Sequence, residues 1–162
     1  MALSPNRTRQ QLSGIPFFYR FIATGFFSGY SPFAPGTAGS AAALVFFLLP
    51  FFGRPEVLMP ATIIIFILGG VAAEKAENLL GQDPSPVTID EVAGMWLSLW
   101  FLPHSLPYIG AAFFLFRFFD IVKPFPASYF DRKSGGWNIM LDDVMAGIYT
   151  NIILQVFYRV FP

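Results

Sequence analysis

Long apolar segments alternate with short polar segments that contain proline and glycine along most of the chain. The apolar segments are predicted as helices over 40–52, 58–73, 92–102, 106–119 and 143–161. Most are shorter than the ~20 residues that cross a bilayer, so helical turns at their polar ends would have to complete the spans. The pattern predicts an all-α, multi-helical integral membrane protein with about four to five short transmembrane helices.

The N-terminal region differs from this pattern. Residues 1–14 are polar and are predicted to be a flexible tail. The stretch 1–11 carries Arg7 and Arg9, but no apolar run follows it at once, so we do not expect a cleaved signal peptide. Residues 15–27 are apolar and rich in aromatic side chains, but Arg20 interrupts them, so we expect an interfacial or re-entrant helix. The predicted organisation is a tail followed by a single membrane-embedded domain over 15–162.

The composition supports a membrane location and excludes several functions. Hydrophobic residues make up 55% of the chain, with 21 phenylalanines, and charged residues make up 12%. A soluble domain is usually about 25% charged, so these apolar side chains need lipid around them. The formal net charge of zero provides no basic surface for nucleic acid. The absence of cysteine excludes disulfides, thiolate metal sites and cysteine nucleophiles.

Pairing the apolar segments as hairpins places the polar loops 28–40, 74–91 and 120–142 on one side of the membrane. That side holds Lys75, Lys123, Arg132 and Lys133, with Arg117 just inside the membrane. The other side holds only Arg54 and Arg159. The positive-inside rule then predicts that the loop-rich side faces the cytoplasm.

Two pairs of adjacent acids, Asp90/Glu91 and Asp142/Asp143, are each predicted to open an apolar helix. Helix capping explains one acid at a helix start, because a carboxylate accepts from the free N–H groups there. Two acids at each of two helices exceed that need. Hard carboxylate oxygens suit Mg²⁺ or Mn²⁺, so the pairs favour a metal site, with capping as the alternative.

A second group of charges lies at the end of an apolar segment. Arg117, Asp120 and Lys123 are spaced to share one helical face, and Pro124 ends the helix behind them. Each charge buried in lipid would cost roughly 2.5–3.5 kcal/mol. These side chains must therefore pair with one another, face an aqueous pocket or bind a charged ligand.

The next polar segment contains Asp131, Arg132 and Lys133. Such a cluster in a loop is usually solvated, but beside the other acids it offers cations for a phosphate. His104, the only histidine, falls on the opposite predicted side, so we expect no catalytic role for it.

The loop 31–40 is rich in glycine, proline and serine and leads into a helix. Free N–H groups at such a helix start can bind an anion, and the hydroxyls of Thr37 and Ser40 could add to them. A simple turn with a helix cap is the alternative. The loop is not a nucleotide-binding P-loop, because it has no lysine.

Taken in order, these motifs resemble those of the phosphatidylglycerophosphatase A family. The resemblance runs from about residue 20 to 160 and rests on Gly29–Ser40, Asp90-Glu91 with Gly94-Met95-Trp96, Arg117–Pro126, Asp131-Arg132, and Asp142-Asp143 with Ala146-Gly147. It implies an all-helical, Mg²⁺-dependent bacterial lipid phosphatase. Such an enzyme removes the terminal phosphate of phosphatidylglycerophosphate and leaves phosphatidylglycerol. It would act in the bacterial cytoplasmic (inner) membrane, with its active site on the cytoplasmic face.

Combined with the residue pattern, the resemblance gives each motif an expected role. The expected metal ligands are Asp90, Glu91, Asp120 and Asp143. The expected phosphate-binding residues are Thr37, Ser40, Arg117, Lys123 and Arg132. Either Asp142 or Asp131 could be the general base, and direct attack by water and an aspartyl-phosphate intermediate both stay open. A cation transporter or channel and a purely structural membrane subunit are the alternative functions.

Overall fold

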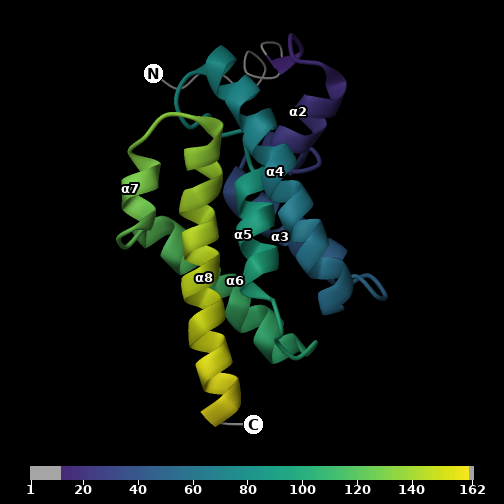
Figure 1. Cartoon of the computed structure of the whole chain (residues 1–162). Helices are drawn as coiled ribbons and strands as arrows, with labels where there is room; N and C mark the ends of the chain where they lie inside the picture. The colour runs from purple at the N-terminus through teal and green to yellow at the C-terminus, as the bar shows by residue number, and fades with distance from the viewer. Residues whose placement is uncertain (1–11, 161–162) are drawn as a thin grey trace.

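Helices form all the regular structure in the computed structural model, which describes residues 12–160 (Figure 1). The elements are α2 (Phe17–Ala23), the 3₁₀ helix η1 (Ser28–Tyr30), α3 (Pro35–Phe47), α4 (Pro55–Leu80), α5 (Ile89–Ser98), α6 (Leu106–Val122), α7 (Ala127–Asp131) and α8 (Gly136–Val160). The all-α prediction is confirmed for this part of the chain. Most of the predicted tail, 1–14, lies outside the described residues, and Leu12 within it is buried.

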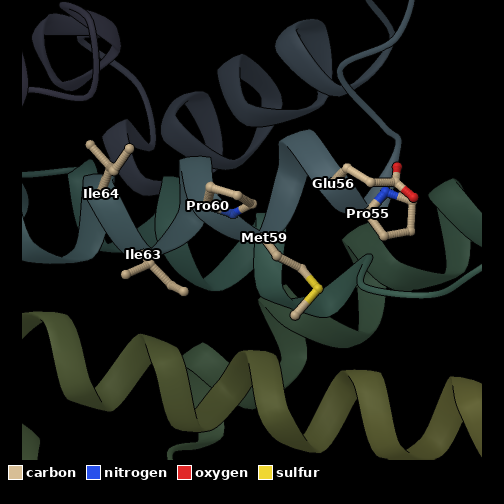
Figure 2. A pocket seen from close by; sticks show the side chains of 6 residues that line it. All are labelled: Pro55, Glu56, Met59, Pro60, Ile63 and Ile64. Carbon is tan, nitrogen blue, oxygen red and sulfur yellow. The ribbon is translucent and has the colours of Figure 1, made fainter.

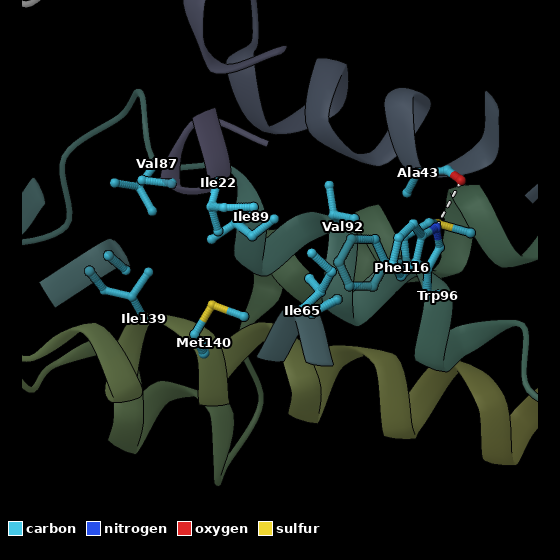
Figure 3. Close-up of a cluster of buried hydrophobic side chains, with 14 of the residues drawn as sticks. Ile22, Ala43, Ile65, Val87, Ile89, Val92, Trp96, Phe116, Ile139 and Met140 are labelled. Carbon is cyan, nitrogen blue, oxygen red and sulfur yellow. Dashed lines mark hydrogen bonds between the residues drawn. The ribbon is translucent and has the colours of Figure 1, made fainter. Parts of the chain in front are cut away.

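The short helix α5 lies at the centre of the molecule, against α3, α4 and α8 (Figure 1). Figure 3 shows Trp96 of α5 in the core, where its indole N–H donates to the carbonyl of Ala43 at 2.9 Å. Where α5 crosses α8, Gly94 faces Gly147, and neither position has room for a Cβ. The acids at the start of α5 are therefore carried on the most enclosed helix of the fold.

The end of α5 differs from the predicted helix over 92–102. The helix stops at Ser98, and two amide side chains of α8 take over the carbonyl groups beyond it. Asn151 Nδ2 donates to the carbonyls of Ser98 at 3.1 Å and Trp100 at 2.8 Å, and Gln155 Nε2 donates to Trp100 at 2.8 Å. Because these partners satisfy the free carbonyls, the helix can end inside the molecule.

The two longest helices extend beyond the apolar segments that predicted them. α4 continues past residue 73 to Leu80, and α8 begins seven residues before the predicted start at 143. The added turns of α4 carry two glutamates whose side chains bind backbone N–H groups at the start of α8. The carboxylate of Glu77 accepts from the N–H of Gly135 at 2.7 Å, and that of Glu74 accepts from Gly136 at 2.5 Å. Apolar periodicity alone marks such turns as loops.

Other boundaries follow local backbone chemistry. α3 begins at Pro35 instead of residue 40, and α4 and α6 likewise have a proline in the first turn, where its missing N–H is harmless. α4 ends at Gly81, which has φ 94°, and α6 ends at Lys123, which has φ 46°. α7 forms within a segment predicted as a loop, and five residues are too few for a periodic pattern.

Two helices of the described chain, α4 and α8, are long and apolar enough to cross a membrane. This is fewer than the four to five spans predicted from the sequence. α5 has 10 residues, and at ~1.5 Å per residue it covers about half of the ~30 Å hydrocarbon layer. Apolar side chains are nevertheless exposed on several helices, including Val45, Ile63, Ile64, Phe114, Phe118, Ile152 and Val156. Such surfaces suit contact with lipid.

Candidate active site

Three carboxylates meet where α5 crosses α8. One oxygen each from Asp90, Glu91 and Asp143 can be chosen so that all lie within 4.8 Å of one another. The first two residues lie in the first turn of α5, and Asp143 lies in the third turn of α8. The side chains are enclosed, with Asp90 8% and Asp143 2% exposed. We call these three residues the carboxylate cluster.

One oxygen of each carboxylate is buried and has no hydrogen-bond partner, namely Asp90 Oδ1, Glu91 Oε2 and Asp143 Oδ2. Buried polar atoms are nearly always paired, and three neighbouring carboxylates repel one another. A divalent cation bound among the three carboxylates would relieve that repulsion. The all-oxygen donor set fits Mg²⁺ or Mn²⁺, so the residues present are suited to the predicted metal.

Capping does not explain the second pair of acids. Asp142 and Asp143 do not open α8 as predicted, because the helix begins six residues before Asp142 at Gly136. The side chain of Asp142 accepts from the N–H of Asp143 at 2.9 Å. No side chain forms a cap hydrogen bond at Thr88, where α5 begins. The acids therefore face one another across the helix crossing instead of serving the helix ends.

Arg117 and Asp120 form an ion pair beside the cluster. Arg117 Nη1 lies 2.6 Å from Asp120 Oδ2, and the side chains are 18% and 13% exposed. Asp120 also interacts electrostatically with Asp143. The group of three carboxylates does not include Asp120. The structure therefore places this predicted metal ligand at the edge of the cluster, paired with the guanidinium of Arg117.

Lys123 binds two carboxylates, and Asp120, its partner in the alternative of mutual pairing, is not one of them. Its Nζ donates to Asp131 of α7 and, at 2.6 Å, to Asp142 of α8. The left-handed backbone of Lys123 turns the chain out of α6, which brings the ammonium to this position. Burial lowers the pKa of Lys123, but the carboxylates of Asp142 and Asp131 raise it more, so the pKa lies above its usual value. Lys123 therefore stays positively charged between α7 and α8.

The first turn of α3 reaches the cluster from a third direction. A Cβ on Gly36 would collide with Glu91 Oε1 and would lie 3.1 Å from Arg117 Nη1. Thr37 follows and is half-buried, whereas Ser40 is fully buried and its hydroxyl donates to the carbonyl of Gly36 at 3.1 Å. The structure therefore brings the start of α3 to the acids, with the Ser40 hydroxyl already engaged in its own helix.

Asp83, in the connection between α4 and α5, belongs to the same region and was not among the predicted site residues. It has a left-handed backbone with φ 43° and interacts electrostatically with Lys123, Asp131 and Asp120. Asp83 is exposed, but partial loss of water around its carboxyl raises its pKa above the ordinary value, and the Lys123 ammonium opposes that rise. The one sequence signal was its place in the polar loop directly before Asp90.

Two further residues lie apart from the carboxylate cluster. Arg132 is exposed on the turn after α7, with no described carboxylate partner. His104 stacks on Phe47, with ring centroids 4.6 Å apart, and its Nε2 lies 3.1 Å from the Phe47 carbonyl oxygen. This contact joins the last residue of α3 to the turn before α6.

The cavity drawn in Figure 2 has a different character. It measures about 530 Å³ and is lined by one face of the first turns of α4, namely Pro55, Glu56, Met59, Pro60, Ile63 and Ile64. None of these residues belongs to the carboxylate cluster, and all but Glu56 are apolar. It is suited to lipid contact and not to the chemistry of the acids.

Comparisons with known proteins agree with this geometry. The family model of phosphatidylglycerophosphatase A matches residues 21–158. A relative in Escherichia coli named phosphatidylglycerophosphatase A is 38% identical, over 84% of this chain and 81% of its own length. The Haemophilus influenzae protein of that name is 41% identical, over 82% and 84%.

A third relative bears another name. A Bacteroides thetaiotaomicron protein, provisionally named a phosphatidylinositol-3-phosphatase, is 42% identical over 83% of this chain and 90% of its own length. No solved structure matches the chain. The matched region contains the carboxylate cluster, the Arg117–Asp120 pair and Lys123, and the chain belongs to the phosphatidylglycerophosphatase A family.

Proposed function

We propose that the protein is a Mg²⁺-dependent lipid phosphatase that converts phosphatidylglycerophosphate into phosphatidylglycerol in phospholipid biosynthesis. The observation that carries the proposal is the group of three enclosed carboxylates, each with one oxygen that lacks a hydrogen bond, in a member of this family. The relatives' names cover two lipid phosphomonoesters, and two of the three specify phosphatidylglycerophosphate. Family membership also favours an enzyme over the alternatives of a cation transporter and a structural subunit.

The metal would be held by Asp90, Glu91 and Asp143, with Asp120 as a further ligand if it leaves Arg117. When bound, a divalent cation supplies positive charge to the phosphate oxygens and makes water more acidic. Mg²⁺ keeps several water ligands in most protein sites, which matches a cluster that offers few protein oxygens.

The phosphate would be bound by cations and by the first turn of α3. Arg117 and Lys123 lie beside the acids and can neutralise phosphate oxygens once their carboxylate partners yield. Thr37 and the free N–H groups of the first α3 turn add donors, and Gly36 leaves space where a side chain would meet Glu91. Ser40 would hold that turn through its hydrogen bond to Gly36.

The reaction requires two proton transfers, one from the attacking water and one to the leaving oxygen. A water oxygen bonds to phosphorus, the bond between phosphorus and the glycerol oxygen breaks, and the leaving oxygen takes up a proton. Asp142 and Asp131 both contact Lys123 and are the candidates to accept the proton of the attacking water. In the alternative covalent route, an aspartate carboxylate would attack phosphorus as the glycerol oxygen leaves with a proton, and water would then hydrolyse the aspartyl phosphate to release phosphate.

We place the protein in the bacterial cytoplasmic membrane, with the acids at the cytoplasmic face. The supporting observations are the bacterial relatives, the two helices of spanning length and the exposed apolar side chains on α3, α4, α6 and α8. In this arrangement α3, α4, α6 and α8 cross the bilayer with help from their flanking turns, and α5 enters it from the cytoplasmic side. Cysteines introduced at Ser85 and Ser134 should then react only from the cytoplasm, and one at Arg54 only from outside.

Phosphate release from the purified protein tests the function. Phosphatidylglycerophosphate, phosphatidylinositol 3-phosphate and glycerol 3-phosphate should be compared with Mg²⁺ present and with excess chelator. We expect turnover of phosphatidylglycerophosphate to be fastest and to stop in chelator. Full turnover in chelator would refute the metal, and preference for phosphatidylinositol 3-phosphate would refute the assigned substrate.

A further inference from the structure

A separate cavity lies against α7, the helix beside the upper part of α8 in Figure 1. It measures about 410 Å³, within the range of small-ligand sites. Its lining, which we call the α7 pocket, consists of Phe125, Ser128, Tyr129, Arg132 and Lys133. None of these residues belongs to the carboxylate cluster, and none is acidic.

The α7 pocket has an excess of positive charge. The ion pairs of the described residues include neither Arg132 nor Lys133, whereas Lys123 nearby in the chain is bound by two carboxylates. Lys133 Nζ donates to the hydroxyl of Tyr129 at 2.5 Å and lies 3.9 Å from the centre of its ring. A neutral phenol leaves the ammonium charge uncompensated, so the pocket is suited to an anion.

The other residues indicate what carries that anion. Phe125 is 80% exposed and Tyr129 is 50% exposed, and aromatic side chains of this kind concentrate where a bilayer meets water. Ser128 and Arg132 are four residues apart around α7, as are Tyr129 and Lys133, so hydroxyl, guanidinium and ammonium groups line one side of the turn. Phosphate groups with apolar chains attached match this combination.

The α7 pocket and the proposed active site use neighbouring residues of the same turn. Asp131 binds Lys123, and Arg132 follows it directly in the pocket lining. Lys123 also binds Asp142, the neighbour of the cluster residue Asp143. A molecule bound in the pocket would therefore have one end close to the segment that holds Lys123.

We propose that the α7 pocket binds the phosphodiester of an anionic membrane phospholipid. The proposal rests on the function above in one respect, because that substrate carries both a phosphodiester and a terminal phosphate. Arg132 offers a planar fork to two oxygens of the diester, and Lys133 adds a point charge. The diester is held by the α7 pocket while the terminal phosphate is free to reach the carboxylate cluster.

Short-chain phosphatidylglycerol is the probe that separates this proposal from the phosphatase activity. It has the phosphodiester and no terminal phosphate, so its binding can be measured whether or not the protein hydrolyses anything. We would titrate it into the purified protein in detergent and compare the wild type with the variant Arg132→Gln/Lys133→Gln. The variant should bind at least about tenfold more weakly, the scale expected for two cations near a lipid surface.

The matched control is Arg54→Gln/Arg159→Gln, which removes two exposed cations elsewhere. It should bind phosphatidylglycerol as the wild type does. Phosphatidylcholine, which carries a compensating positive charge, should bind weakly to every form, and inorganic phosphate should compete poorly. Because Arg132 and Lys133 are exposed, the pocket variant should keep the wild-type melting temperature.

Three outcomes would overturn the proposal. The first is equal affinity of the wild type and the pocket variant for phosphatidylglycerol. The second is an equal loss of affinity in the control variant. The third is displacement of the lipid by inorganic phosphate at similar concentration, which would make the pocket a site for free phosphate. Absence of phosphatase activity with normal phosphatidylglycerol binding would refute the proposed function and leave this one standing.

Discussion

Gly147 of α8 lies against the main chain of Gly94 of α5, where a Cβ on Gly147 would come within 2.5 Å of the Gly94 carbonyl oxygen. Each glycine is four residues beyond an acid of the carboxylate cluster, Gly94 after Asp90 and Gly147 after Asp143. Residues four apart lie on the same helical face, so this contact sets the distance between the acids.

The first prediction concerns that contact. Gly147→Ala should force α5 and α8 apart, because the added methyl group meets main chain that cannot move aside alone. We expect a loss of about 1–3 kcal/mol in unfolding free energy and a large loss of phosphatase rate. Gly110→Ala in α6 is the control, since a Cβ there meets nothing within 4 Å. Equal melting temperatures for the two variants would contradict the close crossing.

The second prediction concerns the acids themselves. Asp90→Asn and Asp143→Asn should each lower turnover by at least ~10²-fold, the scale of one lost electrostatic partner in an active site. The fold should persist, because each amide has the shape of the acid and removes a like-charge repulsion. Glu56→Gln, on the first turn of α4, is the control and should keep its rate. Near-normal turnover in the cluster variants would exclude these acids from catalysis.

The third prediction is that Mg²⁺ stabilises the folded protein. A ligand that binds only the native state adds about 2.7 kcal/mol when its concentration is a hundred times its dissociation constant. The melting temperature of the wild type should therefore rise with added Mg²⁺ and fall again with chelator. In Asp143→Asn the rise should be much smaller. The same rise in both proteins would mean that Mg²⁺ binds elsewhere.

The fourth prediction separates two roles of Lys123. Lys123→Met leaves the buried Asp142 without its cation and should lower the unfolding free energy by about 1–3 kcal/mol, between the values for exposed and buried pairs. Adding Asp142→Asn to it should restore part of that stability. A rate lost in Lys123→Met and not recovered in the double variant would assign Lys123 to the substrate as well.

The pH dependence of the Lys123 contribution follows from the direction of its pKa. A lysine whose folded pKa is raised stabilises the fold fully below its unfolded pKa of about 10.4, and loses this effect as pH rises through the folded value. The stability difference between the wild type and Lys123→Met should therefore be constant between about pH 7 and 9. A difference that shrinks over this range would show that Lys123 is not held by its carboxylate partners.

The fifth prediction concerns the start of α3. Gly36→Ala places a methyl group on Glu91 Oε1, which is the end of a side chain and can shift. The melting temperature should change little, whereas the rate should fall because one cluster carboxylate is displaced. Thermal unfolding and phosphate release measured on the same sample test whether the rate falls without a loss of stability. A normal rate would show that Glu91 tolerates displacement.

Apolar patterning located the main helices but not their polar ends. The last turns of α4 and the first turns of α8 are helical because Glu74 and Glu77 accept hydrogen bonds from Gly136 and Gly135, respectively 62 and 58 residues away in the chain. Nothing local in the sequence encodes such a contact. The same reason hid the true position of Asp143, which the apolar pattern placed at the start of its helix.

The candidate site was partly accessible from the sequence, because adjacent acids beside apolar helices are unusual and the family motifs are specific. The structure brings Asp90, Glu91 and Asp143 together, and it pairs Lys123 with Asp131 and Asp142, two partners that the sequence reasoning did not assign to it. That choice depends on the left-handed backbone at Lys123, and the sequence shows only the proline that follows. Asp83 was missed because a single acid in a polar loop has no distinguishing pattern.

Because α5 is enclosed, we expect that substrate, water and phosphate can reach the acids from one end of the protein only. Beyond the acids, Met95 of α5, Leu99 directly after that helix and Phe116 of α6 are buried, and we expect these apolar side chains to form a barrier toward the other end of the molecule. Substrate, water and released phosphate must then enter and leave at the end that carries the acids. Hydrolysis would move no charge across the bilayer, so its rate in sealed vesicles should be the same with and without an imposed membrane potential.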